Sequence, residues 1–420
     1  MDVPDTIQLM GDKQWQEIKS RLTGKFNKMM KGLFRQKGAQ LDINILASDE
    51  AQEFITTHAG ILDGGFQKVE MSDKMRERLT RSNYIFSGIK TFHELNEAFP
   101  SMLDENGNKK PFERFLNDVR KINDTYNANY LHAEYNFVQA SATMAAKWEQ
   151  FSEDGDRYYL QYRTAKDDKV RPEHAALDGV TLPMSDSFWE TYYPPNGWNC
   201  RCTVVQVRKQ KYPATEHGEA MSRGEEAMNG ERYNIFRFNS GKQGKTMPDY
   251  NPYTIKRCND CDVAKGGNTK LGFVPDYQLC QGCIMIRKCN EDRNRDNSAK
   301  ATKKSPEVKK LQGTTISNPD FNHEVLVTGG SIREWTNQPH KEYAAKNSIL
   351  KHIAKVFREA KYIGFIDNFK KKPGVKQSHL FETNVLGELS WIIVREYEIG
   401  EFVLHSISDS DKIKTGIRKE

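Results

Sequence analysis

The cysteines are the feature that most restricts how this sequence can fold. All seven lie between Cys200 and Cys289, within less than a quarter of the 420 residues. A disulfide framework would spread paired cysteines through a small secreted domain, so an odd number in one cluster favours metal ligation.

Four of the cysteines form two C-x2-C pairs, which are separated by eighteen residues: Cys258 with Cys261 and Cys280 with Cys283. This spacing is typical of a four-thiolate zinc site, because a tight turn lets both sulfurs of a pair reach one ion. Gly282 lies inside the second pair, where backbone freedom would help the sulfur geometry. Four thiolates leave no open coordination position, so the predicted zinc is structural. The alternative is a redox pair, although the sequence lacks a thioredoxin-like βαβ context.

A second candidate metal site lies upstream. Cys200 and Cys202 are one residue apart, so we expect them on one side of a strand, where both thiolates could meet His174. A carboxylate would complete a tetrahedral set, and two are close in sequence: Asp168 and Asp178. In the alternative interpretation the cysteines and histidine are only packed and hydrogen-bonded, and Arg171 forms an internal ion pair with Asp178.

Length and composition favour a multidomain protein. A chain of 420 residues is too long for one ordinary core, and mean hydropathy of -0.77 with 29% charged residues describes surface-rich parts. No run approaches the roughly 20 apolar residues that cross a bilayer, and the N-terminus lacks secretory signal features, so we expect synthesis in the cytoplasm and no membrane partner. The net charge of +6 permits nucleic-acid contact without requiring it.

The predicted fold class is α+β with several domains. Apolar residues at helical spacing between Trp15 and Phe34, and an uninterrupted stretch from Phe112 to Phe151, predict a helical N-terminal third. Short strand-like segments begin at Arg157. The expected divisions are a helical region (1–84), a small α+β core (85–208), a polar arm with the four-cysteine module (209–289), a basic flexible linker (290–313) and a C-terminal domain (314–420).

The C-terminal domain has its own core pattern. The sequence predicts one helix, at 339–359, against an antiparallel four-stranded sheet, with turns at Lys371-Lys372-Pro373-Gly374, Gly387 and Gly400. A further strand is expected at 324–328, and the four strands of the sheet at 362–366, 379–385, 389–397 and 401–407.

Four motifs follow one another between residues 164 and 202. They are T-x-x-D (Thr164–Asp167), V-R-x-x-H (Val170–His174), D-G (Asp178–Gly179) and P-P-x-G-x-x-C-R-C (Pro194–Cys202). Together they resemble the phage Mu F-like head morphogenesis family across residues 85–208. This resemblance implies a minor head protein of a phage or prophage that acts at or near the portal, has portal and capsid proteins as partners, and resides in the virion head after assembly in the host cytoplasm.

The C-terminal domain resembles the barnase/EndoU/colicin/RelE-like nuclease domains found fused to phage head proteins. This resemblance implies metal-independent RNA cleavage, which needs an acid, a base and stabilisation of the phosphorane charge. The candidate residues are His379 as acid or base, Lys346 and Arg395 for phosphate stabilisation, and Ser406 and Ser408 for positioning.

Two alternatives to an RNA-cleaving head protein remain open. In the first, the C-terminal domain is a non-catalytic binding module of a purely structural protein. In the second, the chain is a packaging factor that binds phage DNA through the cysteine module and the basic linker.

Overall fold

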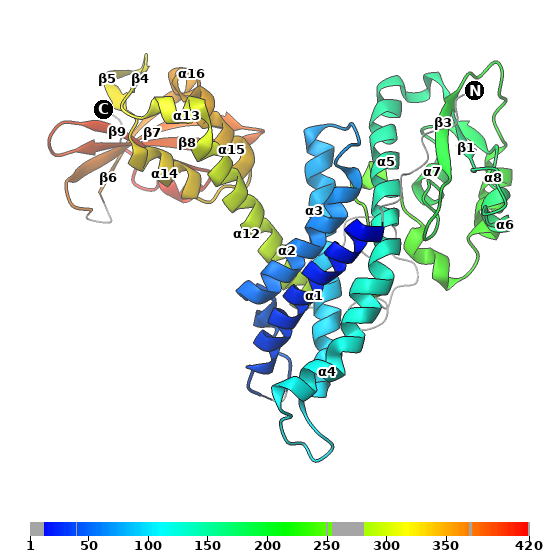
Figure 1. Cartoon of the computed structure of the whole chain (residues 1–420). Helices are drawn as coiled ribbons and strands as arrows, with labels where there is room; N and C mark the ends of the chain where they lie inside the picture. Colours follow the sequence, from blue (N-terminus) through cyan, green and yellow to red (C-terminus); the bar gives the residue numbers. More distant parts are fainter. Residues whose placement is uncertain (1–11, 39, 249–250, 254–280, 369–371, 419–420) are drawn as a thin grey trace. The chain divides into compact units, whose positions relative to one another are not determined.

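The computed structural model describes residues 12–38, 40–248, 251–253, 281–368 and 372–418 (Figure 1). They form two compact units, Met1–Asn290 and Glu291–Glu420, and the boundary falls within helix α12 (Gln281–Lys304). The fold is mixed α+β, with helices at the N-terminus and a sheet in the C-terminal unit, which confirms the predicted class. No helix in the described ranges combines the length and apolar composition that crossing a bilayer requires.

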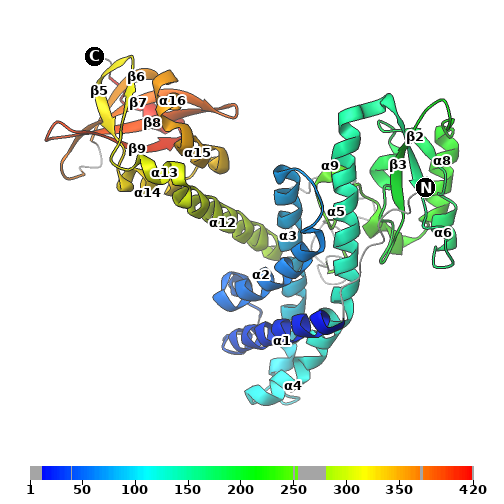
Figure 2. The same cartoon turned by 45° about the horizontal axis from the view of Figure 1, so that its top comes forward.

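Five long helices build the N-terminal part of the first unit (Figures 1 and 2). They are α1 (Asp12–Phe34), α2 (Asp49–Asp63), α3 (Asp73–Ala98), α4 (Phe112–Asn123) and α5 (Leu131–Asp154). A π-helix, η4 (Asp124–Tyr130), joins α4 to α5, so the predicted helical stretch from Phe112 is continuous. Serine side chains begin two of the helices: Ser48 accepts a hydrogen bond from the Ala51 amide, and Ser72 from that of Met75.

A buried lysine connects three of these helical segments. Lys90 of α3 is fully buried, and its ammonium group donates to Glu134 Oε2 of α5 (2.7 Å) and to the Tyr126 carbonyl of η4 (2.7 Å). The third contact is His58 Nε2 of α2, at 3.1 Å. Burial and the Lys90 charge lower the pKa of His58 to about 4, so this ring is neutral at pH 7 and can accept the bond.

Helices α3 and α12 approach each other closely through glycines. A Cβ atom at Gly88 would lie 2.5 Å from Ile286 Cγ2, and one at Gly282 would lie 2.7 Å from Phe92 Cε1. Gly282 is therefore explained by helix packing. The predicted role of its backbone in sulfur geometry concerns a cysteine module that lies mostly outside the described residues.

The rest of the first unit is a three-stranded antiparallel sheet with short helices around it. The strand order is β2 (Thr181–Pro183), β1 (Tyr159–Arg163), β3 (Thr203–Val207). The helices are α6 (Pro172–Ala175), α7 (Phe188–Thr191), α8 (His217–Ala227) and α9 (Ser240–Gln243). The predicted polar arm is partly folded, because Phe236 and Phe238 pack on Phe137 of α5, with ring centroids 5.5 and 6.3 Å apart.

The second unit contains a six-stranded sheet in the order β4-β5-β9-β8-β7-β6. Its strands are β4 (Thr315–Asn318), β5 (Phe321–Leu326), β6 (Lys361–Asp367), β7 (Val375–Val385), β8 (Glu388–Tyr397) and β9 (Phe402–Ser408). Neighbouring strands are antiparallel except β5 and β9, which are parallel. The helices are α13 (Pro306–Leu311), α14 (Gly329–Asn337), α15 (Tyr343–Ile349) and α16 (Ile353–Glu359).

The sheet is wider than the predicted one, and its helices are more broken. The four predicted strands form β6 to β9, and the further strand predicted at 324–328 corresponds to β5. The short polar β4 was not predicted. The sheet is not antiparallel throughout as predicted, because β5 is parallel to β9. A 3-10 turn, Leu350–His352, separates α15 from α16 within the predicted single helix. Helix α14 was not predicted. Its capping box pairs the N-cap residue Thr328 with Ser331, whereas the usual sequence signal has Glu or Gln three residues after the N-cap.

The predicted flexible linker at 290–313 is helical instead. Helix α12 continues to Lys304, and α13 follows directly. No glycine or proline interrupts the sequence from Cys283 to Lys304, and its many lysine, arginine and alanine residues have high helix propensity. Ser305 then caps α13, with Pro306 in the first turn, where proline is well tolerated.

The carboxyl group of Glu94, one turn after Lys90, should make the stability of the first unit depend on pH. Neither of its oxygens has a hydrogen bond of good geometry among the described residues, and burial raises its pKa from 4.5 to about 8. The folded protein thus keeps a proton that the unfolded chain releases above pH 4.5, so stability falls as pH rises from 4.5 to 8. We expect Glu94→Gln to raise the unfolding temperature at pH 8.5 by about 4 °C or more, with little change at pH 5.

Thermal unfolding followed by circular dichroism at both pH values would measure this difference. Glu77→Gln, on an exposed position of the same helix, is the matched control and should have no such pH-dependent effect. Equal pH dependence in the Glu94→Gln and wild-type proteins would contradict a proton held on Glu94.

Candidate functional site

The best-defined candidate site lies beside the three-stranded sheet. His174 is in the short helix α6, which begins with Pro172, and its side chain is 2% exposed. Cys200 and Cys202 follow a tight loop and are 5% and 8% exposed. They lie just before β3, which begins at Thr203, and not within the strand as predicted. The prediction that these three side chains meet agrees with the geometry, because their ligand atoms all lie within 4.8 Å of one another.

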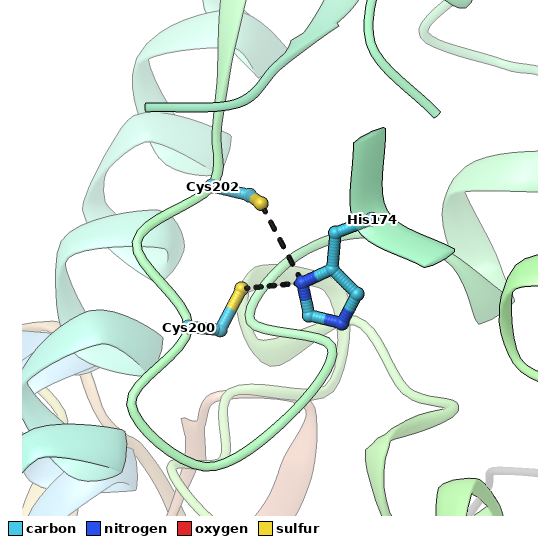
Figure 3. A group of neighbouring side chains, drawn as sticks. All are labelled: His174, Cys200 and Cys202. Atoms are coloured by element: carbon cyan, nitrogen blue, oxygen red, sulfur yellow. Dashed lines mark hydrogen bonds between the residues drawn. The ribbon is translucent and has the colours of Figure 1, made fainter. Parts of the chain in front are cut away.

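Both sulfur atoms point at the same nitrogen (Figure 3). His174 Nδ1 is 3.6 Å from Cys200 Sγ and 3.7 Å from Cys202 Sγ. A neutral imidazole nitrogen has one lone pair and can accept one hydrogen bond, so two thiols cannot both donate to it well. Zinc bond lengths at a tetrahedral angle place nitrogen and sulfur ligands ~3.6 Å apart. The two observed nitrogen-to-sulfur distances therefore fit a zinc tetrahedron that has His174 Nδ1 and both sulfurs as ligands.

The loop that carries the cysteines is fixed by polar contacts on its other side. Tyr162 of β1 donates to Asn196 Oδ1 (2.8 Å), and Arg171 Nη2 donates to the Trp198 carbonyl (2.6 Å). Arg201 forms a bidentate pair with Asp167, with distances of 2.5 and 2.6 Å. The hydrogen bonds from Arg201 hold the pKa of Asp167 at about 2. These contacts add to the apolar packing of the region, whose Tyr162, Trp189 and Tyr193 are fully buried in the core of the first unit.

No carboxylate belongs to the cluster among the described residues. Asp178 instead accepts hydrogen bonds from the Thr164 amide (2.8 Å) and hydroxyl (3.1 Å), and Lys166 lies 3.5 Å from its other oxygen. The expected ion pair between Arg171 and Asp178 is therefore wrong, because each side chain has other partners. Asp178 closes the turn between β1 and β2, so it does not supply the fourth metal ligand.

The thiols of Cys200 and Cys202 differ in acidity because they are hydrogen-bonded to each other, which affects their pKa values in opposite directions. The hydrogen bond from Cys202 lowers the pKa of the Cys200 thiol, and the neighbouring His174 adds to this effect. The bond to Cys200 raises the pKa of Cys202 in turn. His174 Nε2 is buried and has no hydrogen-bond partner within the described residues. A bound divalent cation would favour both thiolates and supply a cross-link between α6 and the loop before β3.

The predicted four-cysteine site lies mostly outside the described residues, which exclude Cys258, Cys261 and Cys280. Cys283 is described: it lies near the start of α12, is 3% exposed and packs in the core of the first unit. The four-thiolate zinc site stays a prediction.

The predicted nuclease residues do not form one cluster. Lys346 of α15 is buried, and its ammonium group donates to the carbonyl oxygens of Trp335 (2.7 Å) and Gln338 (2.6 Å). Burial lowers its pKa to about 8. These bonds tie α15 to the end of α14, which is a structural role.

His379 of β7 is also enclosed by the protein. It is 2% exposed, and its nitrogens lie 3.0 Å from Tyr362 Oη and 3.0 Å from Glu396 Oε2. Its ring packs against Phe321, with the ring centroids 4.8 Å apart. Both nitrogens therefore have protein partners in this conformation.

The other three predicted nuclease residues share the opposite face of the sheet. His379 pairs with Val394, so the next residue, Arg395, points to the other side. Ser406 and Ser408 pair with Ile393 and Trp391, which lie on the same face as Arg395. Sequence alone could not provide this pairing register. Tyr362 and Glu396, the partners of His379, were not singled out because no short motif links them.

Comparison with known proteins agrees with the motif order in the first unit. The family profile described as phage Mu protein F like protein matches residues 106–205, and one described as large polyvalent protein-associated domain 3 matches residues 294–404. The chain is 34% identical over 102 residues to the Mu-like prophage FluMu F protein of Haemophilus influenzae, a match that covers 24% of this chain and 22% of that one. No solved structure matches the chain.

A second relative shows the relationship over most of both chains. The putative capsid assembly protein F of Escherichia phage Mu is 31% identical over 328 residues, which cover 72% of this chain and 68% of that protein. The matched length extends well beyond the motifs around His174 and the paired cysteines. The chain therefore belongs to the phage Mu F-like protein family.

Proposed function

We propose that this chain is a minor head protein that acts in capsid assembly of a phage or prophage. The observation that carries the proposal is its 31% identity, over 68% of the length of the phage Mu protein, to a putative capsid assembly protein. In this proposal the chain works at or near the portal, contacts portal and shell proteins, and stays in the virion head after assembly in the host cytoplasm.

The geometry of the first unit supports an assembly role over a catalytic one. His174, Cys200 and Cys202 are buried, whereas a catalytic group must be accessible to its substrate. A metal ion bound there would hold the short helix α6 and the loop before β3 together, which would stabilise the surface that they present to partners. We infer that the ion is zinc, because two thiolates and one imidazole are ligands that zinc prefers and the distances fit it.

For the C-terminal unit we propose a binding role without RNA cleavage. Lys346 is engaged by backbone carbonyls, and His379 and Arg395 lie on opposite faces of the sheet. An acid, a base and a phosphate-binding cation would have to meet around one phosphate for cleavage. The predicted ribonuclease remains the second candidate, in which His379 would have to leave Glu396.

The zinc proposal predicts a metal content that depends on the upstream cysteines. Replacement of Cys200 and Cys202 by serine should remove one zinc ion per chain, measured by elemental mass spectrometry of the purified protein. The unfolding temperature should fall by roughly 5 °C or more, because the loop loses its cross-link. Cys289→Ser is the matched control, since Cys289 is outside both proposed ligand sets.

A parallel variant in Cys258 and Cys261 separates the two proposed zinc sites, because it should leave the ion at His174 in place. Cobalt substitution gives an independent readout through sulfur-to-cobalt charge-transfer absorption, which should weaken in the Cys200→Ser/Cys202→Ser protein. An unchanged metal content in that protein would refute the upstream site.

The assembly proposal predicts a defect in particle formation. Deletion of the coding sequence from the phage or prophage that carries it should reduce DNA-filled heads, counted by electron microscopy after induction, and expression of the wild-type chain should restore them. Purified particles should contain the chain in few copies by quantitative mass spectrometry. Complete heads without the chain, together with its absence from portal and shell preparations, would overturn the proposal.

The proposed binding role of the C-terminal unit predicts no RNA cleavage. We expect the full chain in EDTA to leave labelled RNA intact, with His379→Ala giving the same result. Cleavage that produces cyclic-phosphate ends and disappears in His379→Ala would instead establish the ribonuclease. Cleavage that persists in His379→Ala would point to a contaminating nuclease.

A further inference from the structure

The hairpin between β7 and β8 has an unusual amino acid at its turn. Val385 pairs with Glu388, so Leu386 and Gly387 alone connect the two strands. Both have positive φ, at 49° and 91°. A two-residue turn of this geometry favours Asn-Gly, because a side chain at the first position crowds the backbone and asparagine tolerates this region better than leucine. Leu386 therefore occupies a strained position.

Packing does not compensate for this strain. The Leu386 side chain is 78% exposed, and Leu389, which follows closely on β8, is 45% exposed. Single exposed apolar residues are common on protein surfaces, so exposure alone indicates no function. The other described non-glycine residues with positive φ are Lys166 and Asn199, which are both polar. Within this described set, Leu386 is the residue that combines an apolar side chain with a strained backbone.

The turn is fixed by contacts on both strands. Asn384 Oδ1 accepts a hydrogen bond from the Gly387 amide (2.7 Å), and Val385 is buried in the core of the second unit. On the other strand, Glu388 forms an ion pair with Lys341 (3.0 Å). A leucine on a rigid support loses little conformational entropy when a partner buries it, which favours binding. The turn is therefore a fixed apolar projection with polar and charged groups around it.

We propose that Leu386 is an anchor that inserts into an apolar pocket of another protein of the head. Strained backbone conformations cluster at functional sites, where the surrounding structure holds them in place. An apolar centre with a polar rim is also the usual arrangement of a protein interface. That the partner is a head protein rests on the proposed assembly function.

A lipid surface fits the hairpin turn less well than a protein pocket does. A single myristoyl chain holds a protein only weakly to a bilayer, and the two leucine side chains present less apolar surface than such a chain. The neighbouring charges are of both signs, from Lys341 and Glu388, whereas attraction to anionic lipid requires a cluster of basic residues. The observations therefore favour a protein partner.

The test measures how much of the chain enters heads. Wild-type and variant chains are supplied to a phage or prophage that lacks the coding sequence, and their copies in purified heads are counted by quantitative mass spectrometry. Leu386→Asn should reduce the copies at least about threefold, because the anchor is lost. Leu386→Met keeps the apolar group and should be incorporated like the wild type. Ile399→Asn is the matched control, since Ile399 lies at the turn beyond the other end of β8 and is 79% exposed.

The stability of the purified full chain separates lost binding from lost folding. Asparagine relieves the strain at position 386, so Leu386→Asn should slow amide exchange in β7 and β8 by roughly threefold or more, measured by hydrogen–deuterium exchange mass spectrometry. Ile399→Asn should leave the exchange unchanged, because Ile399 does not have positive φ.

Equal copies of the wild-type and Leu386→Asn chains in heads, or an equal loss with Ile399→Asn, would rule out the anchor. Faster exchange in Leu386→Asn would do the same, because the leucine would then serve the fold. Flotation with vesicles of phosphatidylethanolamine and phosphatidylglycerol, or self-association, that disappears in Leu386→Asn would identify a lipid or a second copy as the partner instead. Absence of the wild-type chain from heads would refute the assembly proposal and this inference with it, which is a different outcome from failure of the anchor alone.

Discussion

A lysine amine buried among helices must have all three of its N–H groups bonded, and this requirement organises the first unit. Lys90 meets it with a carboxylate from α5, a carbonyl from η4 and the neutral ring of His58 from α2. The series of hydrogen bonds continues beyond His58. Its Nδ1 lies 2.7 Å from Ser87 Oγ, and the Ser87 hydroxyl donates to the Asn83 carbonyl (2.7 Å). An unpaired buried ammonium would cost several kcal/mol, so these helices must keep their relative positions.

The same network shapes the surface around it. The π-helix presents the Tyr126 carbonyl to Lys90, and π-helical turns of this kind are frequent at functional sites. It also brings the rings of Tyr126 and Tyr130 into an edge contact, with their centroids 5.7 Å apart. Glu134 accepts hydrogen bonds from both the buried amine and the Tyr253 hydroxyl. The buried ion pair and the packing of these aromatic rings therefore depend on the same side chains.

Sequence reasoning succeeded where the signal is local. The helices at Asp12–Phe34 and from Phe112 follow from apolar spacing, and the meeting of His174 with Cys200 and Cys202 follows from a short ordered set of motifs. It failed where position depends on partners distant in sequence. Lys90 and Glu134 are 44 residues apart, and nothing near either one indicates burial.

In the C-terminal unit, too, sequence reasoning located the elements but not their contacts with distant segments. The strands from β6 to β9 could be predicted from alternation and turn residues, yet the faces of His379 and Arg395 depend on a pairing register that alternation does not specify. The helical course of α12 was missed because a polar composition was interpreted as disorder, although the absence of glycine and proline favours a helix. Composition and helix propensity gave opposite answers there, and propensity was the better guide.

Trp198 connects the cysteine loop to the helical part of the first unit. Its carbonyl accepts a hydrogen bond from Arg171, and its ring packs against Phe137 of α5, with the centroids 5.2 Å apart. Cys200, which faces His174, follows two residues later. A metal ion bound at the cysteines would therefore also restrain the loop that holds the Trp198 ring against α5, so the small sheet and the long helix would share one stabilising contact.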